Sequence, residues 1–325
     1  LTQRYGTASL DVKGAGTLEL TNTNNKFSGT TRLLDTSTLL LSGTGRLAGP
    51  GSNIYGGRIS IGSGTTLDVS STAKQEWDGV INGSGDFNIN AGIVDLGGNS
   101  TFTGDTTIAS GARLQIGRGG TTGSIAGNIQ IDSGGALRYF RGDTNSVVLN
   151  NTISGTGDLQ FAGQAAVATS SYTASKASPN FFGNVDVLDG ARLLLKHHQG
   201  VGMGQYTDSN NNPQTSLIRV HDGGTLMIAV GDGNTVVHNL EVEGTGWYEY
   251  VGRIGALRMA TGDLTGTITM TGDTRFGAWR GERGIINSVI DDGGNGYDFQ
   301  KWGNGRLTLT GANTYSGDTI VSGGQ

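Results

Sequence analysis

The stretch Gly14-Ala15-Gly16-Thr17-Leu18-Glu19-Leu20 joins a Gly-x-Gly to a short run in which every second residue is apolar. The pattern returns four times, and two and four residues after the second glycine every copy is apolar. The further copies are Gly83–Ile89, Gly155–Phe161, Gly244–Tyr250 and Gly303–Leu309. A period of two predicts β-strands with one face buried and the other in water.

A second strand is expected after the first strand of each copy. An apolar residue, in most copies aromatic, shortly before a glycine marks its approach. The five anchors are Phe27-Ser28-Gly29, Phe102-Thr103-Gly104, Phe181-Phe182-Gly183, Leu264-Thr265-Gly266 and Tyr315-Ser316-Gly317. Ten residues after that glycine, the first four copies have an apolar residue: Leu39, Leu114, Leu193 and Phe276. A period of roughly 50 to 90 residues is typical of stacked repeats.

Similar short apolar runs fill the gaps, and no stretch has the pattern of an amphipathic helix. The runs are Ile129 to Ile131, Val147 to Leu149, Leu217 to Val220, Leu226 to Val230 and Leu240 to Val242. Glycine supplies 59 of the 325 residues, mostly between runs, where tight turns are needed. Equivalent residues stack well when each coil lies over the last, so we predict an all-β solenoid, a parallel β-helix of roughly 14 coils. It would fill residues 1–325 as a single solenoid of about five imperfect modules.

The stretch Gly303 to Gly324 resembles the autotransporter-associated β-strand repeat of bacterial passenger domains, as does Asn99 to Gly117. Gly14 to Leu41 and Asn180 to Leu195 resemble it in part, and Gly244 to Met270 only weakly. The resemblance implies a right-handed β-helix exported to the bacterial cell surface. It implies no particular activity, because the repeat is a scaffold that carries different functions.

The composition excludes several partners. The chain has no cysteine, 15% charged residues and a net charge of −5, so no basic stripe exists to bind nucleic acid. The longest apolar run has five residues, so we expect no membrane-spanning segment in this region. The last copy stops at Gln325 before a further strand, which predicts self-association end to end or continuation of a longer chain.

Catalytic, cofactor and metal sites are not predicted. Asp291-Asp292 has the form of paired acids in β-helical hydrolases, but Asp-Asp before Gly-Gly is ordinary turn sequence. Gly293 to Gln300 matches most of a calcium-binding nonapeptide, in one copy only. Arg141-Gly142-Asp143 is an integrin-type tripeptide that a turn explains equally well.

Candidate binding residues lie in interruptions of the repeat. We predict inserted loops at 162–180 and 196–216, the second with His197, His198, Tyr206 and Asp208. In the repeat Trp247 takes an outward place, whereas Tyr248 and Tyr250 take inward places. Trp247 is therefore expected on the outer face. There it either forms, beside Glu249, an exposed platform for a glycan or a host cell-surface protein, or is covered by a neighbouring loop.

The predicted function is a non-enzymatic extracellular scaffold, the adhesive passenger segment of a bacterial surface protein. A self-assembling subunit of an extracellular filament or sheath, stacked head to tail, is the alternative. A β-helical polysaccharide lyase or hydrolase is a third, and it would need convergent carboxylates on one face.

Overall fold

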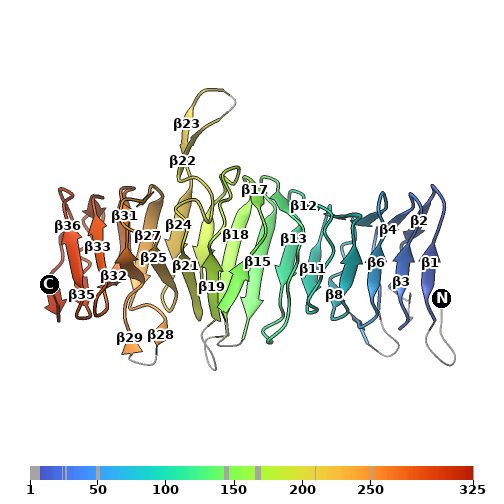
Figure 1. The fold of residues 1–325 in the computed structure, drawn as a ribbon, viewed down its shortest axis with the longest axis horizontal. Helices are drawn as coiled ribbons and strands as arrows, with labels where there is room; N and C mark the ends of the chain where they lie inside the picture. Colours follow the sequence, from blue (N-terminus) through green and yellow to red (C-terminus); the bar gives the residue numbers. More distant parts are fainter. Residues whose placement is uncertain are drawn as a thin grey trace. The chain divides into compact units, whose positions relative to one another are not determined.

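The computed structural model describes residues 8–23, 25, 28–48, 52–142, 146–164, 170–208, 210–249 and 252–324 (Figure 1). These residues form 37 strands and no helix, so none of them belongs to a helix that could cross a membrane. The fold is a parallel β-solenoid of about 13 turns, which confirms the predicted fold class. The chain divides into two compact units, which we term unit 1 (1–141 with 151–158) and unit 2 (142–150 with 159–325).

Unit 1 has three rows of parallel strands, each row collecting one strand from successive turns. The first row is β1 (Leu10–Val12), β3 (Thr31–Leu33), β6 (Ile59–Ile61) and β9 (Ile81–Gly83). The second is β2 (Thr17–Leu20), β4 (Thr38–Leu41), β7 (Thr66–Val69), β10 (Asp86–Ile89), β12 (Thr106–Ile108), β14 (Ile129–Ile131) and β17 (Ile153–Gly155). The third is β5 (Ile54–Tyr55), β8 (Gln75–Trp77), β11 (Ile93–Leu96), β13 (Arg113–Ile116) and β15 (Ala136–Arg141).

Unit 2 also winds as rows of parallel strands. One row contains β16 (Ser146–Leu149), β19 (Ser170–Ala174), β21 (Ala191–Leu195), β25 (Thr225–Ala229) and β30 (Leu257–Thr261). Another contains β18 (Asp158–Gly163), β20 (Val185–Val187), β24 (Leu217–Val220) and β27 (Asn239–Gly244). The ten-residue β32 (Ile268–Gly277) continues both rows, to β34 (Ile290–Asp291) and to β35 (Phe299–Trp302) with β37 (Thr319–Ser322). The last row is β26 (Thr235–Val236), β31 (Asp263–Leu264), β33 (Arg283–Ile286) and β36 (Arg306–Leu309).

The interior of each unit consists of columns of apolar side chains in register. In unit 1, Leu18 pairs with Leu39, Leu39 with Leu67, and Leu67 with Phe87, and the last three are fully buried. Full burial of such a side chain contributes about 1.5–3 kcal/mol. The predicted inward positions are confirmed in the first three copies, where only Leu18 is half-buried. In the fifth copy Leu307 and Leu309 are half-buried, as is Thr308 between them, so the alternation does not separate an inner from an outer face there. Phe27 and Tyr250 lie outside the described residues.

A column of glycines lines one corner of unit 1. A Cβ atom at Gly57 would lie 2.2 Å from the carbonyl oxygen of Gly29, and one at Gly79 would lie 1.9 Å from that of Gly57. The same contact recurs at 2.5 Å between Gly98 and the carbonyl oxygen of Gly79. Real Cβ atoms do not approach an oxygen this closely, so successive turns can stack here only because the corner carries no side chains.

Two of the sequence predictions need correction. Ser170–Ala174 lie within the range predicted as an inserted loop at 162–180, but they form β19, a buried strand paired with β16 and β21. Tyr248 was expected to point inward, but its side chain is 63% exposed. It belongs to β28 (Tyr248–Glu249), which pairs antiparallel with β29 (Gly252–Arg253) in a hairpin outside the parallel rows.

Candidate functional site

The hairpin of β22 (Gln205–Thr207) and β23 (Pro213–Thr215) projects away from the coils of unit 2 (Figure 1). Asp208 shapes its turn, because its Oδ1 atom accepts the backbone N–H groups of Asn210 and Asn212, each at 2.9 Å. Its Oδ2 atom accepts the side-chain amide of Gln214 at 3.1 Å. These hydrogen bonds, that from the Asn212 backbone most of all, lower the pKa of Asp208. The carboxylate therefore ties Asn210, Asn212 and Gln214 together.

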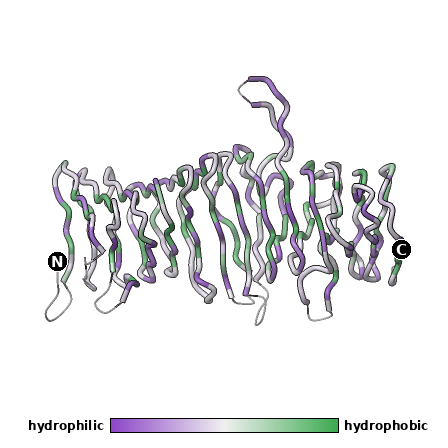
Figure 2. Tube along the Cα trace, turned by 180° about the vertical axis from the view of Figure 1, so that it is seen from behind, coloured by the Kyte–Doolittle hydropathy of each residue, from purple (hydrophilic) through white to green (hydrophobic). Residues whose placement is uncertain are grey.

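Tyr206 connects this hairpin to the coils. Its ring stacks on that of Phe182 with the centroids 4.4 Å apart. Near the end of the hairpin, the hydroxyl of Ser216 donates to the carbonyl oxygen of Met203 at 2.8 Å. The hairpin is largely hydrophilic (Figure 2). It is a polar projection with an aromatic anchor near its base.

The predicted pair His197 and His198 lies just after β21. Their rings stack with centroids 4.6 Å apart and planes 19° from parallel, which adjacent residues of a strand cannot do. The Nδ1 atom of His197 accepts the backbone N–H of Gln199 at 3.0 Å. Both histidines thus belong to a turn, as expected. Among the described residues, no three His, Cys, Asp or Glu side chains come together in a way that could hold a metal ion.

Trp247 is not an exposed platform, which corrects the prediction. Its side chain is 7% exposed, and the guanidinium of Arg192 lies 4.3 Å from the centre of its ring. Its backbone N–H donates to the hydroxyl of Thr225 at 2.8 Å. The cause is Gly246, whose φ of +84° turns the chain out of the coil. In the other four copies the second glycine does not have a positive φ, so the strand continues.

Glu249 is also committed to a contact within the chain. Its carboxylate accepts Nη1 of Arg258 at 2.7 Å, and Glu282 accepts Nε of the same arginine at 3.0 Å. Burial alone would lower the pKa of Arg258, but the two carboxylates raise it. The side chain of Arg258 is 9% exposed, so the ion pairs are shielded from water. Glu249 therefore fastens the β28–β29 hairpin to the coils.

These contacts bring together a cluster that the sequence did not suggest. Arg192 contacts Trp247, and two carboxylates, those of Glu249 and Glu282, hold Arg258. Arg192 also donates to the hydroxyl of its strand neighbour Ser171 at 3.1 Å. The six predicted surface residues do not form one site. The β22–β23 and β28–β29 hairpins leave unit 2 on opposite sides (Figure 1).

Asp292 of the Asp291-Asp292 pair has a structural task. Its Oδ2 atom accepts the backbone N–H groups of Gly296 at 2.8 Å and Tyr297 at 3.0 Å, and the hydroxyl of Ser316 at 2.9 Å. Burial would raise the pKa of Asp292, but the hydrogen bonds, led by those from Ser316, lower it to about 2. The carboxylate thus stays charged and ties one turn of the solenoid to the next.

Of the Arg-Gly-Asp tripeptide, the arginine is buried and engaged within the chain. Arg141 is 8% exposed and donates to the carbonyl oxygen of Gly123 at 3.1 Å. It also donates to the carbonyl oxygen of Thr121. Asp143 lies outside the described residues.

Comparison with known proteins supports the repeat. Three stretches, residues 10–35, 89–116 and 299–325, match the passenger-associated-transport-repeat. A stretch of 101 residues is 37% identical to the adhesin BmaC autotransporter of Brucella suis biovar 1 (strain 1330), and it covers 31% of this chain and 2% of that adhesin. No solved structure matches the chain. Three stretches of the chain are therefore repeats of the passenger-associated-transport type, and part of the chain is similar to an autotransporter adhesin.

Proposed function

We propose that this chain is a non-enzymatic, extracellular adhesive segment of a bacterial surface protein. The coils form the scaffold, and the β22–β23 hairpin contacts a host or cell-surface partner. The observation that carries the proposal is this polar hairpin, projecting from coils that otherwise repeat. Binding residues are commonly placed on loops that a rigid scaffold positions.

The hairpin is organised before a partner arrives. Asp208 fixes its turn, Asn211 takes the left-handed conformation with φ of 60°, and Tyr206 stacks at the base. An ordered loop loses less conformational entropy on binding than a flexible one does. Its side chains are mostly amides and hydroxyls, which suit a hydrogen-bonded partner.

The alternatives make different demands. A β-helical lyase or hydrolase needs carboxylates free to exchange protons with substrate, whereas Asp292 holds a turn and has a pKa of about 2. A filament subunit needs end-to-end association, so it predicts polymers of the purified chain that electron microscopy would reveal.

The adhesive role can be tested on the bacterial surface. The chain is fused to a display carrier in a non-adherent laboratory bacterium, and attached bacteria are counted on cultured epithelial cells. We expect adhesion from the wild-type chain and a loss of most of it when residues 205–215 are replaced by a Gly-Ser linker. Tyr248→Ser, on the other hairpin, is the control and should adhere like the wild type. Equal attachment with and without the wild-type chain would refute the proposal.

A further inference from the structure

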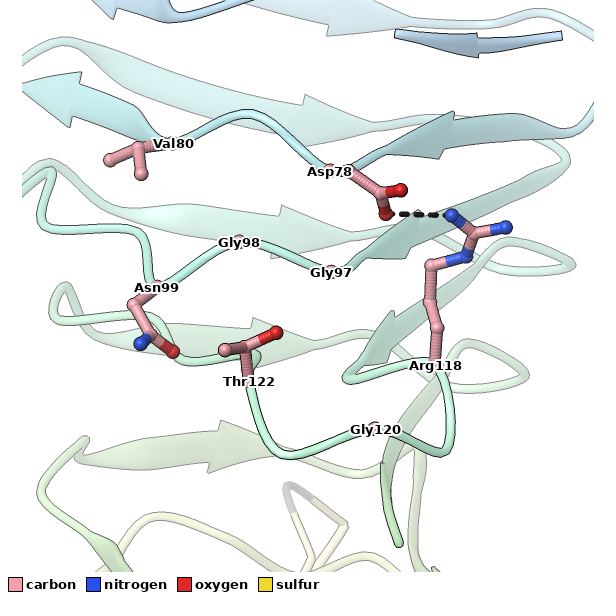
Figure 3. A pocket seen from close by; sticks show the side chains of 8 residues that line it. All are labelled: Asp78, Val80, Gly97, Gly98, Asn99, Arg118, Gly120 and Thr122. Carbon is pink, nitrogen blue, oxygen red and sulfur yellow. Dashed lines mark hydrogen bonds and ion pairs between the residues drawn. The ribbon is translucent and has the colours of Figure 1, made fainter. Parts of the chain in front are cut away.

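Three successive turns of unit 1 contribute to a pocket of about 650 Å³ (Figure 3). Strands β8, β11 and β13 end in register, with Leu96 paired to both Trp77 and Ile116. Asp78 and Gly97 directly follow the ends of β8 and β11, and Arg118 lies two residues after the end of β13; all three line the pocket. The volume is within the range of about 300–1,000 Å³ that small-molecule sites occupy.

The middle of these three turns leaves room for side chains of the two outer turns to form an ion pair. Arg118 donates from Nη1 to Oδ1 of Asp78 at 2.6 Å across the turn that contains Gly97 (Figure 3). A Cβ atom at Gly97 would lie 2.3 Å from this Oδ1 atom and 3.4 Å from Cδ of Arg118. Glycine at 97 is therefore what allows the ion pair to span two turns. Together with Gly98 and Gly120 it leaves bare backbone along the pocket.

The charges in and beside the pocket balance, because Arg141, whose guanidinium donates to the carbonyl oxygens on either side of Thr122, adds a third cation against three carboxylates. Lys74 contacts Asp95 at 2.7 Å and Glu76 at 3.1 Å, while Arg118 contacts Glu76 at 2.9 Å in addition to Asp78. An anionic ligand would meet no positive charge in excess, since carboxylates neutralise Lys74 and Arg118 and backbone carbonyl groups engage Arg141. The arrangement thus disfavours phosphates, sulfates and acidic sugars.

Unused hydrogen-bonding capacity remains, and it is of mixed kind. The side chain of Asp78 is 48% exposed and has a second carboxylate oxygen as an acceptor. Asn99 uses Oδ1 to accept the backbone N–H of Gly123 at 2.9 Å, which leaves the N–H groups of Nδ2 as donors. Thr122 adds a hydroxyl, and Val80 adds one apolar surface. Adjacent hydroxyl groups on a sugar ring, each both donor and acceptor, match such a set.

We propose that this pocket binds a neutral, hydroxyl-rich saccharide. The inference rests on the proposed adhesive function, for which it names a class of ligand at a site remote in sequence from the hairpins. Of the eight residues that line the pocket, Asp78 is the only carboxylate, so the site has no acid and base pair for cleaving a glycosidic bond. It holds the sugar without reacting with it.

The chain offers a blocking variant with a matched control. A Cβ atom at either Gly120 or Gly16 would meet nothing within 4 Å, and neither glycine has a positive φ. Gly120 lines the pocket, whereas Gly16 lies in an exposed turn elsewhere in unit 1. Gly120→Tyr should therefore occlude the pocket, and Gly16→Tyr should add the same side chain without touching it. Thr122→Val is a milder second variant that removes one hydroxyl.

The test is isothermal titration of the full chain with neutral trisaccharides (maltotriose, mannotriose and a galactose-terminated trisaccharide), and with sialyllactose and inorganic phosphate. We expect saturable binding of a neutral sugar, weakened about tenfold or more by Gly120→Tyr, weakened less by Thr122→Val and unchanged in Gly16→Tyr. Circular dichroism checks that each variant folds. If Gly120→Tyr does not fold, the binding of the neutral sugar by Thr122→Val tests the inference instead.

Three results would overturn the assignment: no saturable binding of any neutral sugar by the wild type, equal binding by the blocked variant, or stronger binding of sialyllactose or phosphate. Failure here is distinct from failure of the adhesive role. If the pocket binds no sugar but the displayed chain still adheres through residues 205–215, only this inference falls. If sugar binds but the bacteria do not adhere, only the proposed function falls.

Discussion

At the scale of single residues, the buried Trp247 side chain stabilises the structure by packing against Arg192. We expect Trp247→Ala to lower the free energy of unfolding by about 3–5 kcal/mol, because a large buried side chain would leave a cavity. Urea denaturation followed by circular dichroism measures the change. Tyr248→Ala, one residue away and 63% exposed in the wild type, should change the free energy by less than about 0.5 kcal/mol. Similar stability of the two variants would show that Trp247 does not hold the excursion in place.

This pair also shows where reading the sequence fails. Gly244 and Gly246 occupy the same repeat positions as Gly14 and Gly16, so alternation placed Trp247 outside and Tyr248 inside. The positive φ of Gly246, the second glycine, reverses the two orientations. This φ depends on tertiary contacts, which the local sequence pattern does not contain. The partners of Trp247 and Glu249 lie 9 to 55 residues away in sequence, which no spacing rule anticipates.

At the scale of elements, the corner glycines of unit 1 should be intolerant of any side chain. We expect Gly57→Ala to destabilise the fold by more than about 2 kcal/mol, because its Cβ atom would overlap the carbonyl oxygen of Gly29 and force two turns apart. Gly56→Ala is the control, since a Cβ atom there meets nothing within 4 Å and Gly56 has no positive φ. Thermal unfolding of both variants measures the difference. If the two melt alike, the close approach at this corner has no energetic importance.

Strands were the most predictable elements. The runs Ile129 to Ile131 and Leu217 to Val220 coincide with β14 and β24, because alternation reports burial directly. Ser170–Ala174 were missed because the strand is polar in sequence, yet it is buried between β16 and β21. Only the position of this segment between two core strands indicates a strand, because its composition does not.

At the scale of the whole molecule, acid should weaken unit 2 through His238. This side chain is fully buried, and burial lowers its pKa to about 4, although the Val201 backbone acts in the opposite direction. The pKa of this histidine is lower in the folded chain than its ordinary value of about 6.5 in the unfolded chain. As the pH falls from about 6.5 toward 4, the unfolded chain takes up the proton more readily, and the folded state loses stability. Between pH 7.5 and pH 5 the loss is about 2 kcal/mol.

Urea denaturation at the two pH values tests this expectation. The wild type should lose about 2 kcal/mol more than His238→Leu does over the same interval. His198→Gln, which alters a half-buried histidine in a turn, should keep the acid sensitivity of the wild type. The same pH dependence in His238→Leu would assign the effect to other groups.

The architecture as a whole was predictable, with roughly 14 coils expected and about 13 observed. Residues that recur in a repeat must occupy equivalent environments, so one pattern read five times constrains the whole chain. The pocket beside Asp78 and Arg118 was not predictable in this way. It depends on which residues of different turns fall in register at one corner, 40 positions apart in sequence.

The glycine column at Gly29, Gly57, Gly79 and Gly98 restricts how such a chain can change its length. Inserting a single residue between two of these glycines would move a side chain into the corner and shift the inward set of the next strand outward. Only two kinds of insertion preserve both the corner and the alternation: a complete extra turn with its own glycine, or an excursion that leaves a turn and returns to the same place. A solenoid of this kind lengthens in discrete steps, and new sequence that is not a full step must appear on the outside as a hairpin.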